Sequence, residues 1–147
     1  MNIRTAQETD FKFILQANRD INAHSHLGEM DLQNQNRLKQ DLFGENPKCW
    51  AVIAEIDNKP VGMALYSTTY WTNNGQIMWV SQIYTSPEYR HQGIATELNE
   101  KLCEIAALNG WSRVCCGIEE TNLASQKTFI RAGGKVLRNH NLCTWDI

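Results

Sequence analysis

Several features that mark other classes of protein are missing from this 147-residue sequence. Its longest apolar run, Cys49–Ala54, falls far short of the ~20 residues that cross a bilayer. The opening segment Met1–Thr5 does not begin the apolar stretch of a secretory signal. We therefore expect a cytoplasmic protein with no membrane partner.

An excess of one sign of charge is also missing. The chain has 14 Lys and Arg residues against 16 Asp and Glu, a net charge of -2. Non-specific nucleic-acid binding needs a basic face that displaces counterions, so we expect no nucleic-acid partner. The composition, 42% hydrophobic and 20% charged, excludes a disordered tail and a pure coiled coil. No linker or repeat divides the sequence, and residues 1–147 are expected to form a single domain.

The five cysteines are an odd number and include no Cys-x-x-Cys pair. We expect reduced thiols, mostly buried as small apolar side chains. No spacing of cysteines and histidines matches a zinc site, so no metal is predicted. His24 and His26 lie in a polar segment without an obvious third ligand, and we interpret that segment as a solvated or substrate-side loop.

Hydrophobic periodicity and turn residues predict alternating strands and helices. Glycine and asparagine mark the turns, and Asn73-Asn74-Gly75 favours a hairpin with two positive φ angles. In chain order the sequence predicts a strand from residue 3, a helix with apolar positions over 11–21, a polar segment over 22–30, a helix between Asp31 and Gly44, strands over 49–56, 61–71 and 76–86, a helix over 93–109, a strand over 113–119, a helix over 123–132, and strands near 135–137 and 142–147.

The most informative segment is Gln82–Thr96, which passes from a strand through a short loop into a helix. A helix N-terminus has unpaired N–H groups and a partial positive charge. Gly93 has no Cβ and lets an anion approach the backbone, Ala95 keeps the first turn open, and Arg90 adds a full charge. The segment therefore predicts a phosphate cradle. An ordinary helix start with a packing glycine is the alternative.

Arg90, Gly93 and Ala95, in the order Arg-x-x-Gly-x-Ala, resemble the acetyl-CoA-binding motif of the GNAT acyltransferase superfamily. Asn122, with Gly133 eleven residues later, is similar to the second motif of that superfamily. The predicted order of elements fits the superfamily over essentially the whole chain. The segments Asp41–Gly44 and Gly62–Tyr66 further resemble the branch that includes diamine acetyltransferases.

The resemblance implies an α/β fold of the mixed α+β kind. Its centre is expected to be a mostly antiparallel mixed sheet of about seven strands, splayed in the middle, with about four helices on its faces. The implied reaction moves an acetyl group from acetyl-CoA to a primary amine, with a small molecule favoured as acceptor, by direct attack in a ternary complex. A homodimer is a further possibility, because dimers are common among relatives.

The resemblance also implies how coenzyme A binds. The pyrophosphate would rest on the backbone of Gln92–Thr96, and the pantetheine arm would pair with the edge of Ile83–Thr85, where two strands splay. A backbone N–H near Ile83 or Tyr84 would polarise the thioester carbonyl. The coenzyme-binding residues implied are Ile83, Tyr84, Thr85, Arg90, His91, Gln92, Gly93, Ile94, Ala95, Thr96, Asn122 and Phe129.

Two departures from the superfamily concern catalysis. Phe129 stands where relatives carry a tyrosine general acid, and neutral Ser81 and Gln82 stand where the diamine branch has an acidic pair. Candidate substitutes are Glu119 or Glu120 as base, a water held by Ser81 as proton relay, and the Tyr84 hydroxyl near the thioester, unless strand alternation turns it away. The alternative is a non-catalytic acyl-CoA-binding module that keeps the cradle.

Overall fold

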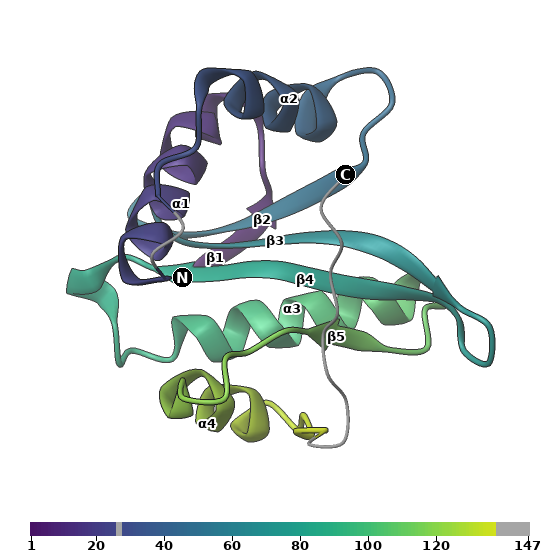
Figure 1. Ribbon diagram of the computed structural model, residues 1–147. Helices are drawn as coiled ribbons and strands as arrows, with labels where there is room; N and C mark the ends of the chain where they lie inside the picture. Colours follow the sequence, from purple (N-terminus) through teal and green to yellow (C-terminus); the bar gives the residue numbers. More distant parts are fainter. Residues whose placement is uncertain (26–27, 138–147) are drawn as a thin grey trace.

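The computed structural model describes residues 1–25 and 28–137, and it shows one sheet with helices on both faces (Figure 1). The strand order is β1-β2-β3-β4-β5, with antiparallel pairing from β1 to β4 and parallel pairing between β4 and β5. The elements are β1 (Asn2–Thr5), η1 (Glu8–Asp10), α1 (Phe11–Ser25), α2 (Leu32–Phe43), β2 (Cys49–Ile56), β3 (Lys59–Trp71), β4 (Gly75–Thr85), η2 (Pro87–Tyr89), α3 (Ile94–Leu108), β5 (Val114–Cys116) and α4 (Leu123–Arg131).

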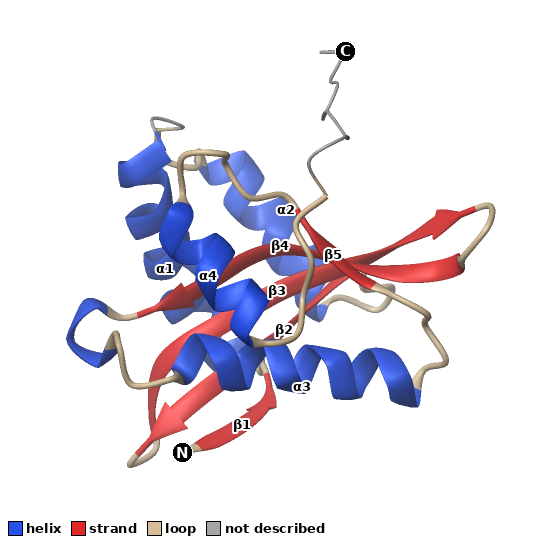
Figure 2. Cartoon of the chain, turned by 90° about the horizontal axis from the view of Figure 1, so that it is seen from below, coloured by secondary structure: helices blue, strands red, loops and turns tan. Residues whose placement is uncertain are grey.

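Strand alternation produces one apolar core on each face of the sheet. On one face α3 buries Ile94 and Leu98 against residues such as Val80. On the other face α1 and α2 bury Ile14 and Leu42 against a second set of strand residues. Figure 1 shows α1 and α2 above the strands and α3 and α4 below them, and Figure 2 looks at the face that α3 and α4 cover.

The mixed sheet and the four α-helices of the described residues agree with the sequence prediction, but the number of strands does not. The described residues form five strands rather than about seven. No strand forms over 135–137, and the strand expected over 142–147 lies outside the described residues. Val136 and Leu137 are exposed, and neither pairs with a strand of the described residues. A strand needs a partner for its backbone groups, and residues 135–137 have none within the described chain.

The two hairpins use different turns. Asp57 and Asn58 both have positive φ, 50° and 59°, as a type I′ turn between β2 and β3 requires. Between β3 and β4 only Gly75 has positive φ, and Asn74 N–H donates to the Trp71 carbonyl at 2.9 Å. The expectation of two positive φ angles in that hairpin was therefore wrong. The turn closes over Trp71–Asn74, and the single left-handed residue, Gly75, follows it as the first residue of β4.

Two other boundaries differ from the prediction. Helix α1 continues to Ser25 instead of giving way to a polar loop at residue 22, and β5 stops at Cys116 instead of residue 119. The caps agree with the prediction: the Asp31 side chain accepts from Asn34 N–H at the start of α2, and α3 begins after Gly93. The early end of β5 matters most, because it opens the sheet.

An ion-pair network joins β1, η1 and β2. Arg4 donates to both carboxylate oxygens of Asp10, at 2.7 and 2.9 Å, and to Glu55 Oε1 at 2.6 Å. Asp10 is only 4% exposed, and it also accepts from Gln7 N–H. The Arg4 hydrogen bonds lower the pKa of Asp10, although burial acts in the opposite direction. The network anchors the start of α1 to the sheet.

The cysteines correct a further expectation. Cys103 is exposed, and Cys49, Cys115 and Cys116 are half-buried, so none of these four is fully buried. All four are free thiols, and burial raises the pKa of Cys49 and Cys116 to about 11. Within the described ranges, no helix combines the length and apolar character needed to cross a membrane.

Candidate functional site

The sheet opens between β4 and β5. The two strands pair only from Met78 to Val80 on β4, opposite β5, whereas β4 continues to Thr85. On its other side β4 stays paired with β3 as far as Thr85. In the described part of the chain, Ser81–Thr85 thus presents a backbone edge without a strand partner. This is the predicted splay, and such an edge can pair with an extended ligand.

A β-bulge lies at the point where the strands part. Val80 pairs with Tyr66 and Gln82 pairs with Leu65, so Ser81 is an extra residue on β4. The extra residue reverses which side chains face which side of the sheet. Val80 packs in the α3 core, whereas Tyr84, four residues later, packs in the α1 and α2 core.

Consequently Tyr84 points toward α1. Its hydroxyl donates to Asp20 Oδ2 at 2.5 Å, and its ring meets Phe13 edge-on with centroids 6.1 Å apart. Burial, and next the hydrogen bond to Asp20, raise the pKa of Tyr84 to about 12. The hydroxyl is therefore protonated at neutral pH and donates its proton to Asp20.

The predicted cradle corresponds to the loop between η2 and α3. His91 and Gly93 both have left-handed backbone, with φ of 63° and 85°. Among the described residues, the N–H groups of residues 91–95 donate to no acceptor. The N–H groups of Thr96 and Glu97, which come next, both donate to the Gly93 carbonyl. A Cβ on Gly93 would meet nothing within 4 Å. Unpaired N–H groups at a helix start beside open space form an anion-binding concavity.

Arg90 adds charge beside the cradle. Its Nε donates to the Thr85 carbonyl at 3.3 Å, which ties the guanidinium to the end of β4. The guanidinium has further donors for an anion. Close by, the Thr85 hydroxyl is buried and has no hydrogen-bond partner within the described chain.

A cavity of about 700 Å³ joins these features. The cavity is lined by residues of α1 on one face of the sheet and by residues of α3 and α4 on the other face. It therefore passes through the splay between β4 and β5. Its lining residues are Asp20, Ile21, His24, Val80, Ser81, Gln82, Ile83, Tyr84, Thr85, Arg90, His91, Ala95, Asn99, Cys116, Gly117, Ile118, Glu119, Asn122, Ala124, Ser125, Thr128 and Phe129.

Most of the residues predicted for the site are brought together here. Ser81, the edge Ile83–Thr85, Arg90, His91, Ala95, Asn122 and Phe129 all line the cavity. Gln92, Gly93, Ile94 and Thr96 do not, and the Ile94 side chain is 2% exposed in the α3 core. Glu120 is exposed and outside the lining, whereas Glu119 belongs to it.

The start of α4 forms part of the cavity wall. Asn122 caps this helix, since its side-chain oxygen accepts from Ser125 N–H at 3.1 Å. The buried Gln126 donates to the carbonyls of Glu119 and Glu120 and so holds the loop after β5. At the other end of α4, Phe129 packs against Gly134, where a Cβ would come within 2.5 Å of its ring.

Sequence analysis missed the contribution of α1. It did not consider Asp20, and it treated His24 only as part of a polar loop, although both line the cavity. One signal was available, because Gln16, Asp20 and His24 recur every fourth residue beside the apolar stripe of the helix. The structure joins them in a row: Gln16 Nε2 donates to Asp20 Oδ1, and His24 Nδ1 lies 2.7 Å from the Asp20 carbonyl.

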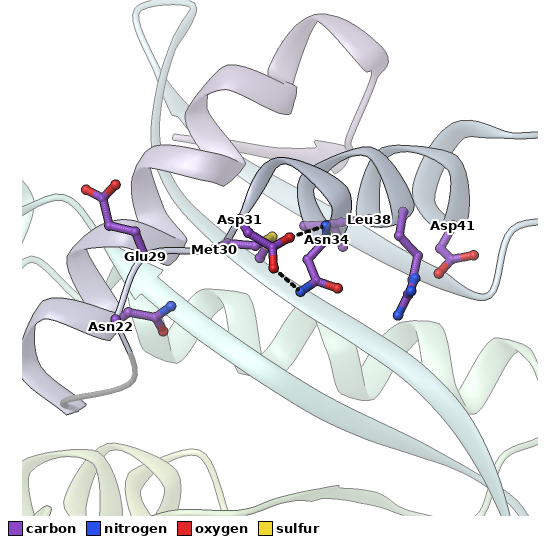
Figure 3. A pocket seen from close by; sticks show the side chains of 9 residues that line it. Asn22, Glu29, Met30, Asp31, Asn34, Leu38 and Asp41 are labelled. Atoms are coloured by element: carbon purple, nitrogen blue, oxygen red, sulfur yellow. Dashed lines mark hydrogen bonds between the residues drawn. The ribbon is translucent and has the colours of Figure 1, made fainter. Parts of the chain in front are cut away.

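A second hollow of about 450 Å³ lies between the end of α1 and α2 (Figure 3). The carboxylates that line it already have partners: Asp31 caps α2, Glu29 pairs with Arg19 at 3.3 Å, and Asp41 pairs with Lys48 at 3.5 Å. Figure 3 shows the Glu29 side chain pointing away from Asp31. In the part of the chain that the structure describes, no three potential metal-ligating side chains form a group.

Comparisons with known proteins agree with this geometry. The model of the acetyltransferase (GNAT) family matches residues 12–133. A Bos taurus protein named thialysine N-ε-acetyltransferase is 30% identical over 143 residues, 92% of this chain and 84% of that protein. Homo sapiens spermidine/spermine N(1)-acetyltransferase-like protein 1 is 32% identical over 112 residues, 71% of this chain and 16% of that protein.

The fold comparison gives the same result. The crystal structure of a possible acetyltransferase from Clostridium difficile 630 superposes with a TM-score of 0.84 at 19% identity, and the match covers 99% of this chain and 97% of that one. The predicted resemblance to the superfamily and its diamine acetyltransferase branch is confirmed. The chain therefore belongs to the acetyltransferase (GNAT) family and is an acyl-CoA-dependent N-acetyltransferase.

Proposed function

We propose that this enzyme transfers the acetyl group of acetyl-CoA to the primary amine of a small molecule, by direct attack while both substrates are bound. The cavity carries this proposal, because it runs from the phosphate cradle through the splay to α1 and gives both substrates access to one point. The name of the bovine relative, a thialysine N-ε-acetyltransferase, supports an amine at the end of a short aliphatic chain.

The residues fit coenzyme A. The unpaired N–H groups over residues 91–95, with Arg90 beside them, suit a diphosphate. The free edge of Ser81–Thr85 suits the amides of a pantetheine arm, and the unpartnered Thr85 hydroxyl offers a further polar contact. When bound, acetyl-CoA supplies an activated thioester.

The chain positions the amine and removes a proton from it. Alkylammonium groups have pKa values near ~10.4, so a proton must leave before attack at neutral pH. Ser81 sits at the bulge beside the splay, where its exposed hydroxyl can hold a relay water, and Glu119 lines the same cavity. We prefer these two over Glu120, which lies outside the lining. A catalytic role of Tyr84 as proton donor stays a prediction.

The test is turnover by the purified full chain. Acetyl-CoA is mixed with thialysine, lysine, spermidine or butylamine, and release of free thiol is followed. We expect turnover with the aminoalkyl compounds and, at saturation, a dependence on both substrates that fits a ternary complex. Coenzyme binding by calorimetry without turnover on any amine would instead support the non-catalytic acyl-CoA-binding module.

The proposed setting is the cytoplasm, which suits the four free thiols of the described residues. A single domain over residues 1–147 and a homodimer stay predictions. Sedimentation of the purified chain at micromolar concentration measures directly whether it is a dimer.

A further inference from the structure

Helix α1 brings a carboxylate into the cavity. Asp20 is half-buried and lines the cavity with Ile21 and His24, on the face of the sheet opposite α3. The features proposed above to bind coenzyme A belong to β4, α3 and α4. Asp20 therefore faces the part of the cavity that the coenzyme features leave for the acceptor.

The hydrogen bonds of Asp20 hold its carboxylate without neutralising it. Tyr84 donates to Oδ2 at 2.5 Å, and Gln16 donates to Oδ1 at 2.8 Å. Both donors are uncharged, and no Lys, Arg or His among the described residues forms an ion pair with Asp20. A carboxylate has about four lone-pair sites, so two remain. A partly buried negative charge without a cation favours a cationic ligand.

Tyr84 connects this carboxylate to the place where the thioester is expected. Its backbone belongs to the free edge of β4, while the bulge at Ser81 turns its side chain toward α1. One residue thus spans both sites. An ammonium group on Asp20 would lie on the α1 side of that edge, next to the splay.

We propose that Asp20 binds the ammonium group of the acceptor amine and that Tyr84 is the positioning residue that orients Asp20. The inference rests on the proposed function, because it requires a primary alkylamine as acceptor. It also accounts for the neutral Ser81 and Gln82 on β4, since α1 supplies the negative charge that this strand lacks.

Steady-state kinetics with butylamine test the proposal. Asp20→Asn keeps the shape and an acceptor for Tyr84 but removes the charge, and we expect its KM for butylamine to rise by about tenfold or more. The KM for acetyl-CoA and the melting temperature should stay near those of wild type. Glu100→Gln on α3, an exposed carboxylate outside the cavity, is the matched control and should change neither KM.

Tyr84→Phe is the second variant. It removes only the hydroxyl, and we expect a smaller rise in the KM for butylamine at nearly constant kcat. If Tyr84 acts through Asp20, the double variant with Asp20→Asn should be no worse than Asp20→Asn alone. Additive effects would overturn the positioning role, and a fall in kcat alone would indicate a proton-donating Tyr84 instead.

A binding experiment separates this inference from the proposed reaction. Butylammonium chloride is titrated into the full chain with free coenzyme A, and amide shifts are followed by NMR. We expect saturable shifts in α1 for wild type that are lost in Asp20→Asn. Equal binding by both proteins would overturn the inference even if wild type turns over amines. Binding that depends on Asp20 without turnover of any amine would contradict the proposed reaction alone.

Discussion

At the scale of single residues, the Arg4–Asp10 pair couples stability to pH. Asp10 is 4% exposed and accepts two hydrogen bonds from Arg4, which lower its pKa from the ordinary value of 3.8. A carboxyl group with a lowered native pKa stabilises the fold above its unfolded pKa. That contribution is lost as pH falls through the native pKa.

We therefore expect Asp10→Asn to lower the free energy of unfolding by about 2–3 kcal/mol near pH 7. The gap between variant and wild type should shrink below a pH of about 3.8, as Asp10 of the wild type takes up a proton. Urea denaturation of variant and wild type at about pH 7 and about pH 3 measures the difference in the free energy of unfolding at each pH.

Glu8→Gln is the matched control, because Glu8 belongs to the same short helix and pairs with Lys39 on the surface, with its side chain 65% exposed. Surface pairs contribute little, so a change below about 1 kcal/mol is expected at either pH. A gap for Asp10→Asn that is equal at both pH values would contradict the linkage.

Phe129 raises a different question at this scale. It lines the cavity at the position where the resemblance to the superfamily implies a tyrosine, and its ring has no proton for a leaving thiolate. If that proton limits the rate, Phe129→Tyr should raise kcat by about tenfold or more. Phe129→Leu, which keeps an apolar side chain, controls for changes in packing. An unchanged kcat for the tyrosine variant would mean that the thiolate takes its proton from water.

At the scale of elements, the start of α3 is the proposed site of coenzyme binding. His91 and Gly93 have left-handed backbone, and within the described residues the N–H groups of residues 91–95 have no acceptor. The bulge at Ser81 has a comparable effect on β4, since it assigns Tyr84 to the α1 face. The first irregularity precedes α3 and the second lies within β4, where its pairing with β5 ends, and in each place a small change of backbone redirects several groups.

Gly93→Glu should abolish coenzyme A binding measured by calorimetry. The change adds negative charge and bulk in front of the N–H groups, and it places a side chain at a φ of 85°. Gly110→Glu provides the control, since Gly110 lies just beyond the other end of α3 with a φ of 70° and open space around it. That variant should have the same backbone strain but normal affinity. Equal loss in both variants would assign the effect to unfolding.

At the scale of the whole molecule, the sheet separates two helical layers, and the splay connects them. The two buried clusters lie on opposite faces, and the cavity of about 700 Å³ is lined from both. In the proposed complex, the cradle and α4 hold acetyl-CoA from one side of the sheet, while α1 contacts the acceptor amine from the opposite side. A sheet that stayed paired to the end of β4 would keep these groups apart.

Local sequence determined the parts of the protein that depend on neighbouring residues. The start of α3 after Gly93, the cap of α4 at Asn122 and the apolar stripes of the helices all follow from residues within one or two turns. Family resemblance then predicted where coenzyme A binds. Only the tertiary structure decided the bulge at Ser81, because a one-residue shift of register leaves no mark in the alternation of a mostly apolar strand.

The contact between Asp20 and Tyr84 was likewise beyond the sequence, since it joins residues 64 positions apart. The contact exists because packing against the sheet sets the rotation of α1 and because the bulge at Ser81 directs the Tyr84 side chain toward α1. The early end of β5 has a similar origin. Strand β4 still offers a free edge beyond Val80, but the chain leaves it after Cys116, and Gln126 of α4 holds the departing loop by hydrogen bonds to the carbonyls of Glu119 and Glu120. Short-range steric and hydrogen-bonding preferences thus determined the elements and the cradle, and long-range packing decided which side chains meet in the cavity.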